Sequence, residues 1–160
     1  MRRFWVPLLI APLLAAWSAT PIAQQAPAKA TPRTIDIQGT DQMKFSVPTI
    51  NAKPGEALRV RLIVVSTLPK VAMSHNFVLF STKATEKHLA DFAQAGMTKG
   101  QVTYIPPAMK DLVLAFTPMG GGGQTVEVTF NAPKQPGSYP YICSFIGHFA
   151  VGMRGTLIVK

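Results

Sequence analysis

The single cysteine, Cys143, begins the segment that most constrains what this chain can fold into. His148 follows after four intervening residues and Met153 after four more, so a thiolate, an imidazole and a thioether recur at five-residue steps. Strand-like runs at 138–142 and 153–159 flank the segment, which places it in a turn between two strands. A small domain with this segment therefore has to bring three soft or borderline metal ligands together at one sheet end.

The ligand set becomes complete with a second imidazole, His75, far upstream. A cysteine, two histidines and a weak methionine hold copper as a one-electron carrier, because thiolate and thioether suit Cu(I) while imidazole also suits Cu(II). Zinc usually takes four strong ligands, and methionine is a poor one for it. A lone cysteine is more often a small buried hydrophobe. Gly147 and Gly152, directly before His148 and Met153, supply the backbone freedom of a tight loop and favour the metal site.

Three blocks of sequence carry a family resemblance. They are 35–45 (IDIQGTDQMKF), 68–79 with Leu-Pro-Lys and Ser-His-Asn-Phe-Val-Leu, and 143–157. On these blocks the chain from 34 to 160 resembles the cupredoxins of the azurin and auracyanin group. The Cys-to-His spacing is longer than in plastocyanins, and the His-to-Met spacing is similar to that of auracyanins. The chain departs from azurins at Phe77 and Ile146, and its single cysteine excludes their disulfide.

The resemblance implies a blue (type 1) copper site, with His75, Cys143 and His148 in a trigonal plane and Met153 as a long axial contact. It further implies that the Ser74 backbone carbonyl approaches from the opposite side. Asn76 is expected to tie the two ligand-bearing loops together. The backbone amides of Asn76 and Phe145 are expected to donate to the cysteine sulfur, and such outer contacts tune a metal's potential.

The resemblance also implies that electrons leave through His148, inside an exposed apolar docking patch. The matched positions for this patch are Met43, Leu68, Met73, Met97, Phe145 and Ala150. A core role for several of these methionines is the alternative.

The periodicity of the chain favours strands over helices. Strands are expected over 58–62 and 125–130, which alternate, and over 76–80 and 112–116, which look more fully buried. The helical exception is 84–93, where Leu89, Phe92 and Ala93 share one face. Short strands with Pro/Gly turns indicate an antiparallel sandwich. Together with the resemblance, this predicts an all-β, cupredoxin-like Greek-key β-sandwich with one short helical excursion. The Gly120–Gly123 run lacks the Lys-Ser/Thr of a phosphate-binding loop and is expected to be a hairpin loop.

The N-terminus has the character of an export signal. Arg2 and Arg3 precede an apolar stretch from Phe4 to Ala19, so residues 1–23 are expected to be a signal peptide. An uncleaved anchor is the alternative. Residues 24–33 are rich in Ala, Pro, Gln and Thr and are expected to form a flexible leader. The cupredoxin domain then spans 34–160, and its expected location is the periplasm.

The charge and the histidine content exclude several classes of function. The chain carries a formal net charge of +9. From 34 to 160, twelve Lys and Arg face seven Asp and Glu, a net charge of +5. These cations are dispersed and carry no nucleic-acid motif. Three histidines in total are too few for a multicopper enzyme, and His88 is expected to be a solvated surface residue. A Cys143–His148 nucleophile pair has no evident orienting group, so no enzyme is expected.

The expected function is therefore electron transfer by one copper ion between redox proteins, such as cytochromes or copper and haem reductases and oxidases. The protein is expected to be a monomer with no small-molecule substrate. The alternative is a copper carrier or chaperone without a redox role. Dispersed methionines with no Met-x-x-Met cluster count against that alternative.

Overall fold

The computed structural model describes residues 31–97 and 102–160. The predicted signal peptide and the leader up to residue 30 lie outside the described residues. The strands are β1 (Arg33–Thr40), β2 (Lys44–Phe45), β3 (Thr49–Ala52), β4 (Ala57–Val65), β5 (Ser74–His75), β6 (Val78–Phe80), β7 (Val113–Phe116), β8 (Gly120–Gly121), β9 (Thr125–Asn131), β10 (Gly137–Ile142) and β11 (Arg154–Val159). An α-helix, α1 (Glu86–Met97), and a 3-10 helix (Pro107–Leu112) lie between β6 and β7. Within the described residues no helix is long and apolar enough to span a membrane.

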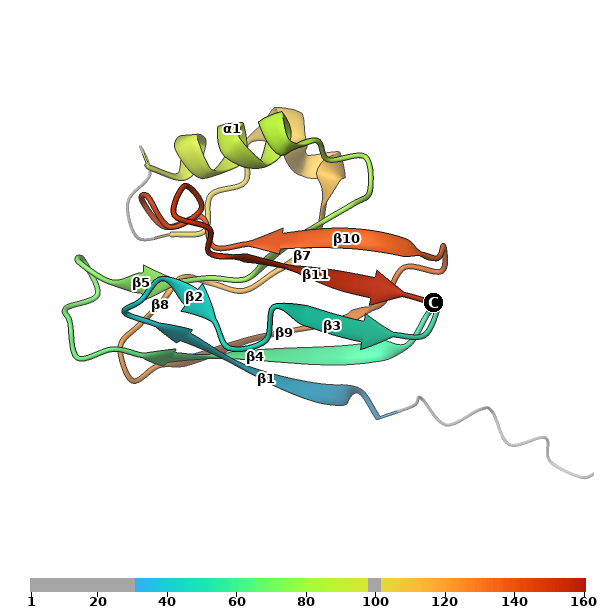
Figure 1. Ribbon diagram of the computed structural model, residues 1–160, viewed down its shortest axis with the longest axis horizontal. Coiled ribbons are helices and arrows are strands. Elements are labelled where there is room, and N and C mark those ends of the chain that lie inside the picture. Colours follow the sequence, from blue (N-terminus) through green and yellow to red (C-terminus); the bar gives the residue numbers. More distant parts are fainter. Residues whose placement is uncertain (1–30, 98–101) are drawn as a thin grey trace, which may run out of the picture.

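Two stacked sheets form the body of the molecule. The first has the order β2-β1-β4-β9 and the second β3-β11-β10-β6-β7, while β5 and β8 make a small third sheet. Helix α1 lies beyond β10, on the far side from β1 and β4 (Figure 1). This arrangement confirms the predicted cupredoxin-like β-sandwich with one helical excursion.

The strands are not antiparallel throughout. β1 pairs with β4, and β3 with β11, in parallel registers, whereas the other pairings are antiparallel. Parallel neighbours need a crossover connection. Between β1 and β4 the chain supplies one by passing through β3, a strand of the opposite sheet. The sheets are therefore mixed, which the local alternation of residues did not reveal.

Alternation along β4 builds the core between the two sheets. Its inward side chains, Leu58, Val60, Leu62 and Val64, are almost completely buried, as the alternation over 58–62 predicted for the first three. Across the core, Phe77 packs against Tyr141 with ring centroids 4.8 Å apart. A second apolar cluster joins the outer face of the other sheet to α1. It comprises Val78, Phe80, Leu89, Phe92, Ile142 and Phe149.

The prediction of a fully buried strand over 112–116 was wrong in part. β7 begins at Val113 because Leu112 ends the 3-10 helix. Leu114 and Phe116 are each 42 % exposed. β7 is one of the two edge strands of its sheet, so one side has no neighbouring strand to cover it.

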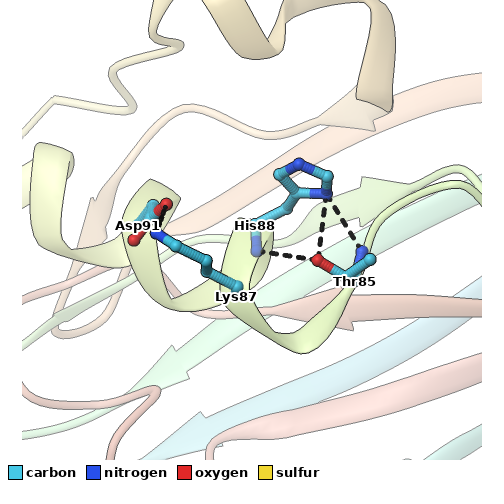
Figure 2. A network of polar contacts seen from close by, with 4 residues as sticks. All are labelled: Thr85, Lys87, His88 and Asp91. Atoms are coloured by element: carbon cyan, nitrogen blue, oxygen red, sulfur yellow. Dashed lines mark hydrogen bonds and ion pairs between the residues drawn. The ribbon is translucent and has the colours of Figure 1, made fainter.

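Helix α1 is two to four residues later than predicted, and a side-chain cap sets its start. The Thr85 hydroxyl accepts a hydrogen bond from the His88 amide at 3.3 Å, and the His88 ring Nδ1 accepts from the Thr85 amide at 3.1 Å (Figure 2). Two free N–H groups of the first turn are thereby satisfied reciprocally, as in a capping box. His88 is half-buried and acts in this cap, so it is not the freely solvated residue that was expected.

The Gly-rich run is only partly a loop. Gly120 and Gly121 form β8, which pairs with Ser74 and His75. The chain then turns through Gly122 and Gly123 into β9. A Cβ at Gly121 would lie 2.8 Å from the Lys70 side chain, so the glycine lets the loop before His75 pack closely.

The layered packing predicts a large difference between two phenylalanines on neighbouring strands. Phe80 is fully buried and meets Phe92 of α1 edge-on, whereas Phe116 is largely exposed. Phe80→Ala should lower the free energy of unfolding by about 3–5 kcal/mol because it leaves a cavity. Phe116→Ala should cost under about 1 kcal/mol. Urea denaturation of the metal-free protein compares the two, and equal losses would contradict the packing described.

Candidate metal centre

The candidate site is assembled from two distant parts of the chain. His75 ends β5, Cys143 directly follows β10, and His148 lies in the loop between β10 and β11. His75 and Cys143 are fully buried, and His148 is 2 % exposed. Together they form the one cluster of potential metal ligands found among the described residues.

Three donor atoms converge on one point. The two imidazole Nδ1 atoms are 3.1 Å apart, and the Cys143 Sγ lies 3.8 Å from the Nδ1 of His75 and 3.5 Å from that of His148. A point equidistant from the three atoms is about 2 Å from each, close to the roughly 2.0–2.3 Å of metal bonds to imidazole nitrogen and thiolate sulfur. The triangle therefore fits a single metal ion.

The backbone of the ligand loop places Met153 beside this triangle. Its amide donates to the His148 carbonyl at 2.9 Å, and its carbonyl accepts from the Cys143 amide at 3.1 Å. Gly147 and Gly152 adopt φ values of 78° and 88°, the left-handed region that their position in the sequence predicted. The Met153 side chain is completely buried in the same cluster as Cys143.

Asn76 joins the two ligand-bearing segments. Its Oδ1 accepts from the Ser144 amide at 2.8 Å, and its Nδ2 donates to the Ser144 hydroxyl at 2.9 Å. All of these atoms are buried, where hydrogen bonds are strong and expensive to lose. Asn76, the residue after His75, is thus bonded twice to Ser144, the residue after Cys143.

Two contacts hold the loop from outside. The Lys44 Nζ donates to the Val151 carbonyl at 3.2 Å. The Arg154 guanidinium lies 5.0 Å from the centre of the Phe149 ring and pairs with Glu86 of α1 at 2.6 Å. Phe149 belongs to the apolar cluster beneath α1, so the loop is attached to both β2 and the helix.

Burial controls the charge of the metal-free site. Burial lowers the pKa of His75 to about 4. The Asp41 carboxylate and a hydrogen bond to the Thr40 backbone raise this pKa but do not offset the effect of burial. Burial also lowers the pKa of His148 to about 4, and the neighbouring His75 lowers it further. The Cys143 pKa is raised to about 12 by burial, while the backbone amides of Asn76 and Phe145 act in the opposite direction. Two neutral imidazoles and a neutral thiol therefore face each other at neutral pH.

Comparison with known proteins decides the family. Residues 33–160 match the family model described as copper binding proteins, plastocyanin/azurin family. The chain belongs to this family. It is 37% identical over 133 residues to an azurin from Pseudomonas denitrificans, covering 79% of this chain and 98% of that protein. Auracyanin-A from Chloroflexus aurantiacus is 33% identical over 130 residues, covering 81% of this chain and 75% of that protein. The solved structure of auracyanin A, a "blue" copper protein, superposes with a TM-score of 0.71 at 32% identity, covering 81% of this chain and all of that one.

Copper is therefore the cofactor, and His75, Cys143, His148 and Met153 form its type 1 site. When bound, copper supplies a one-electron Cu(II)/Cu(I) couple. The chain provides two imidazoles already neutral, a thiol that must lose its proton, and two backbone amides aimed at the sulfur. The approach of the Ser74 carbonyl stays a prediction; the Ser74 hydroxyl is engaged elsewhere, donating to the Lys70 carbonyl at 2.6 Å.

The members of the predicted docking patch differ in exposure. Leu68, Met97 and Ala150 are exposed and Met43 is half-buried, whereas Met73 and Phe145 are buried. Ile146 and Val151, which were not predicted, are 46 % and 52 % exposed. Their position in the sequence could have indicated this exposure. Both are large apolar residues inside the ligand loop, where a turn ordinarily carries polar residues.

Gly39 is a third residue whose part in the site was not predicted. A Cβ at this position in β1 would lie 2.8 Å from Cδ2 of the His75 ring. The strand can approach the imidazole so closely only because this residue has no side chain. A glycine inside an otherwise regular strand was the available signal.

We expect Gly39→Ala to displace the His75 ring and weaken copper binding about tenfold or more, since the added methyl group overlaps a rigid ring. Gly137→Ala is the matched control, because Gly137 also lies in a strand and its nearest neighbour is a Thr82 methyl carbon 3.3 Å away. Competition with a chromophoric chelator measures both affinities. Equal affinity of the two variants would show that the His75 ring does not need the space at Gly39.

The pKa directions predict the proton balance of copper binding. With the Cys143 pKa raised to about 12 and both histidine pKa values lowered to about 4, copper uptake between about pH 5 and pH 10 should release one proton, from the thiol. Only as the pH falls through about 4 do the imidazoles become charged and compete for copper. Titration in weakly buffered solution counts the protons. Release of two or more near neutral pH would contradict the neutral imidazoles.

Proposed function

We propose that this protein is an exported single-electron carrier that passes electrons between redox proteins through its copper site. The observation that carries the proposal is the buried, closely spaced donor triangle. Its three strong ligand atoms lie within 3.8 Å of one another. A site held in one geometry suits both oxidation states, so little rearrangement accompanies electron transfer.

The same burial argues against catalysis on a substrate. His75 and Cys143 have no exposed surface and His148 almost none, so the ligands leave no open side for a small molecule. An enzyme's copper or zinc keeps a coordination position accessible to substrate or water. Burial also argues against a copper chaperone, which has to release its metal to an acceptor. The buried ligands would have to become accessible for that release.

Partners are expected to dock at the end of the sandwich that carries the ligand loop. Leu68, Met97, Ile146, Ala150 and Val151 are exposed apolar or small residues on that loop and on segments predicted to surround it. An exposed apolar patch of this kind marks an interaction site. We propose that cytochromes or copper and haem oxidoreductases bind there to a monomeric protein. The positive charge of the domain favours acidic partners.

The proposed location is the periplasm. The support is the N-terminal sequence, with two arginines followed by an apolar stretch up to Ala19. The azurin and auracyanin relatives are consistent with an exported electron carrier.

Electron self-exchange tests the proposal. Ile146→Glu should slow it at least about tenfold, because two loop ends must meet and a buried charge opposes that contact. Leu114→Glu is the control: Leu114 is similarly exposed but lies on the edge strand β7. NMR line broadening in mixed oxidised and reduced samples gives the rates. Slow exchange in the unmodified protein, insensitive to both substitutions, would favour copper handling over electron transfer.

A further inference from the structure

We infer that Thr103, a residue outside the copper-ligand segments, positions the metal centre by fixing the orientation of Asn76. The inference rests on the copper site and not on the electron-carrier function. Thr103 belongs to the segment between α1 and the 3-10 helix. Its Oγ1 accepts a hydrogen bond from the Asn76 Nδ2 at 2.9 Å. It thus makes the third hydrogen bond of the carboxamide that joins the His75 and Cys143 segments.

The direction of this hydrogen bond is fixed by a second one. The Thr103 hydroxyl donates to the Thr117 carbonyl at 2.8 Å. A hydroxyl has one hydrogen, so with that hydrogen committed it can only accept from Asn76. Asn76 must therefore turn its NH2 group toward Thr103, which leaves its Oδ1 toward the Ser144 amide.

A flipped carboxamide would be penalised at both ends. Its oxygen would face the lone pairs of Thr103, and its NH2 group would face the Ser144 N–H. The Ser144 hydroxyl does not fix the orientation of the carboxamide, since it can rotate to accept or to donate a hydrogen bond. Thr103 therefore supplies the second fixed determinant of the amide orientation.

The contacts close into a ring that includes the ligand segment. Thr117 exchanges two hydrogen bonds with Phe77: the Phe77 amide donates to the Thr117 Oγ1 at 3.0 Å, and the Thr117 amide donates to the Phe77 carbonyl at 2.9 Å. Because Phe77 follows Asn76, the Thr103 bond braces the same segment that carries His75. Asn76 and Thr117 are completely buried, so water cannot readily replace a lost partner.

Helix α1 also meets this network. A Cβ at Gly96 would lie 3.1 Å from the Ser144 carbonyl, so the end of the helix packs directly on the residue after Cys143. The described part of the chain between β6 and β7 thus contacts both ligand-bearing segments: Gly96 packs on Ser144, and Thr103 bonds to Asn76. It contributes to the geometry of a centre that contains none of its residues.

Thr103→Val, which keeps the shape and removes the hydroxyl, tests the inference. In the metal-free protein the Asn76 side-chain hydrogens should exchange with solvent about tenfold faster or more, since a buried donor loses its partner. In the copper protein the thiolate-to-copper absorption band should shift or broaden and the reduction potential should change. Thr103→Ser keeps the hydroxyl and should behave like the unmodified protein.

Thr156→Val is the matched control. Thr156 is also half-buried, and within the described residues its hydroxyl makes no hydrogen bond. It should alter neither the Asn76 exchange nor the copper spectrum. Unchanged exchange and spectrum in Thr103→Val, or a Thr103→Ser variant that behaves like Thr103→Val, would overturn the inference.

A measurement on the unmodified protein covers the case in which Thr103→Val does not fold. The Thr103 hydroxyl proton should be visible by NMR in the metal-free form, with slow exchange and a nuclear Overhauser contact to the Asn76 NH2 group. Absence of that proton from the spectrum, together with rapid Asn76 exchange, would also overturn the inference. Neither outcome depends on whether the protein transfers electrons.

Discussion

The copper site depends on one interaction, the pair of hydrogen bonds between Asn76 and Ser144, which are 68 residues apart in the sequence. His75 and Cys143 are the neighbours of these two residues, so the spacing of the donors follows from hydrogen bonds that contain no metal. Buried amide bonds of this kind are rigid because breaking one leaves a polar group without water. The positions of the donor atoms are consequently fixed by hydrogen bonds of the protein itself.

The fold surrounds this interaction with layers that serve the same purpose. Lys44 and Arg154 hold the ligand loop from outside, and Phe149 anchors it beneath α1. The left-handed glycines let the loop turn back on itself so that Met153 returns to Cys143. A loop that is bonded at so many points has little freedom to adapt to a second coordination geometry. A single fixed geometry is what a one-electron copper site requires.

Burial carries an electrostatic consequence. The low-dielectric surroundings keep both imidazoles neutral and the thiol protonated, with pKa values near 4 and near 12. The site therefore stays uncharged without metal, and the charge of the sulfur appears only together with a cation to balance it. The two backbone amides at the sulfur lessen the cost of that charge.

The sequence by itself predicted the ligands, the metal and the sandwich. The spaced Cys-His-Met loop with His75 upstream indicated copper, and the short strands with Pro/Gly turns, together with the family resemblance, indicated the sandwich. The alternation of β4 likewise predicted its buried face. Three properties were decided only by the tertiary structure. The parallel pairings depend on the crossing of the chain between sheets, and the exposure of Phe116 depends on β7 being an edge. The contacts of Gly39 with His75 and of Thr103 with Asn76 join residues 36 and 27 positions apart, and local pattern contains no information on which distant segments will meet.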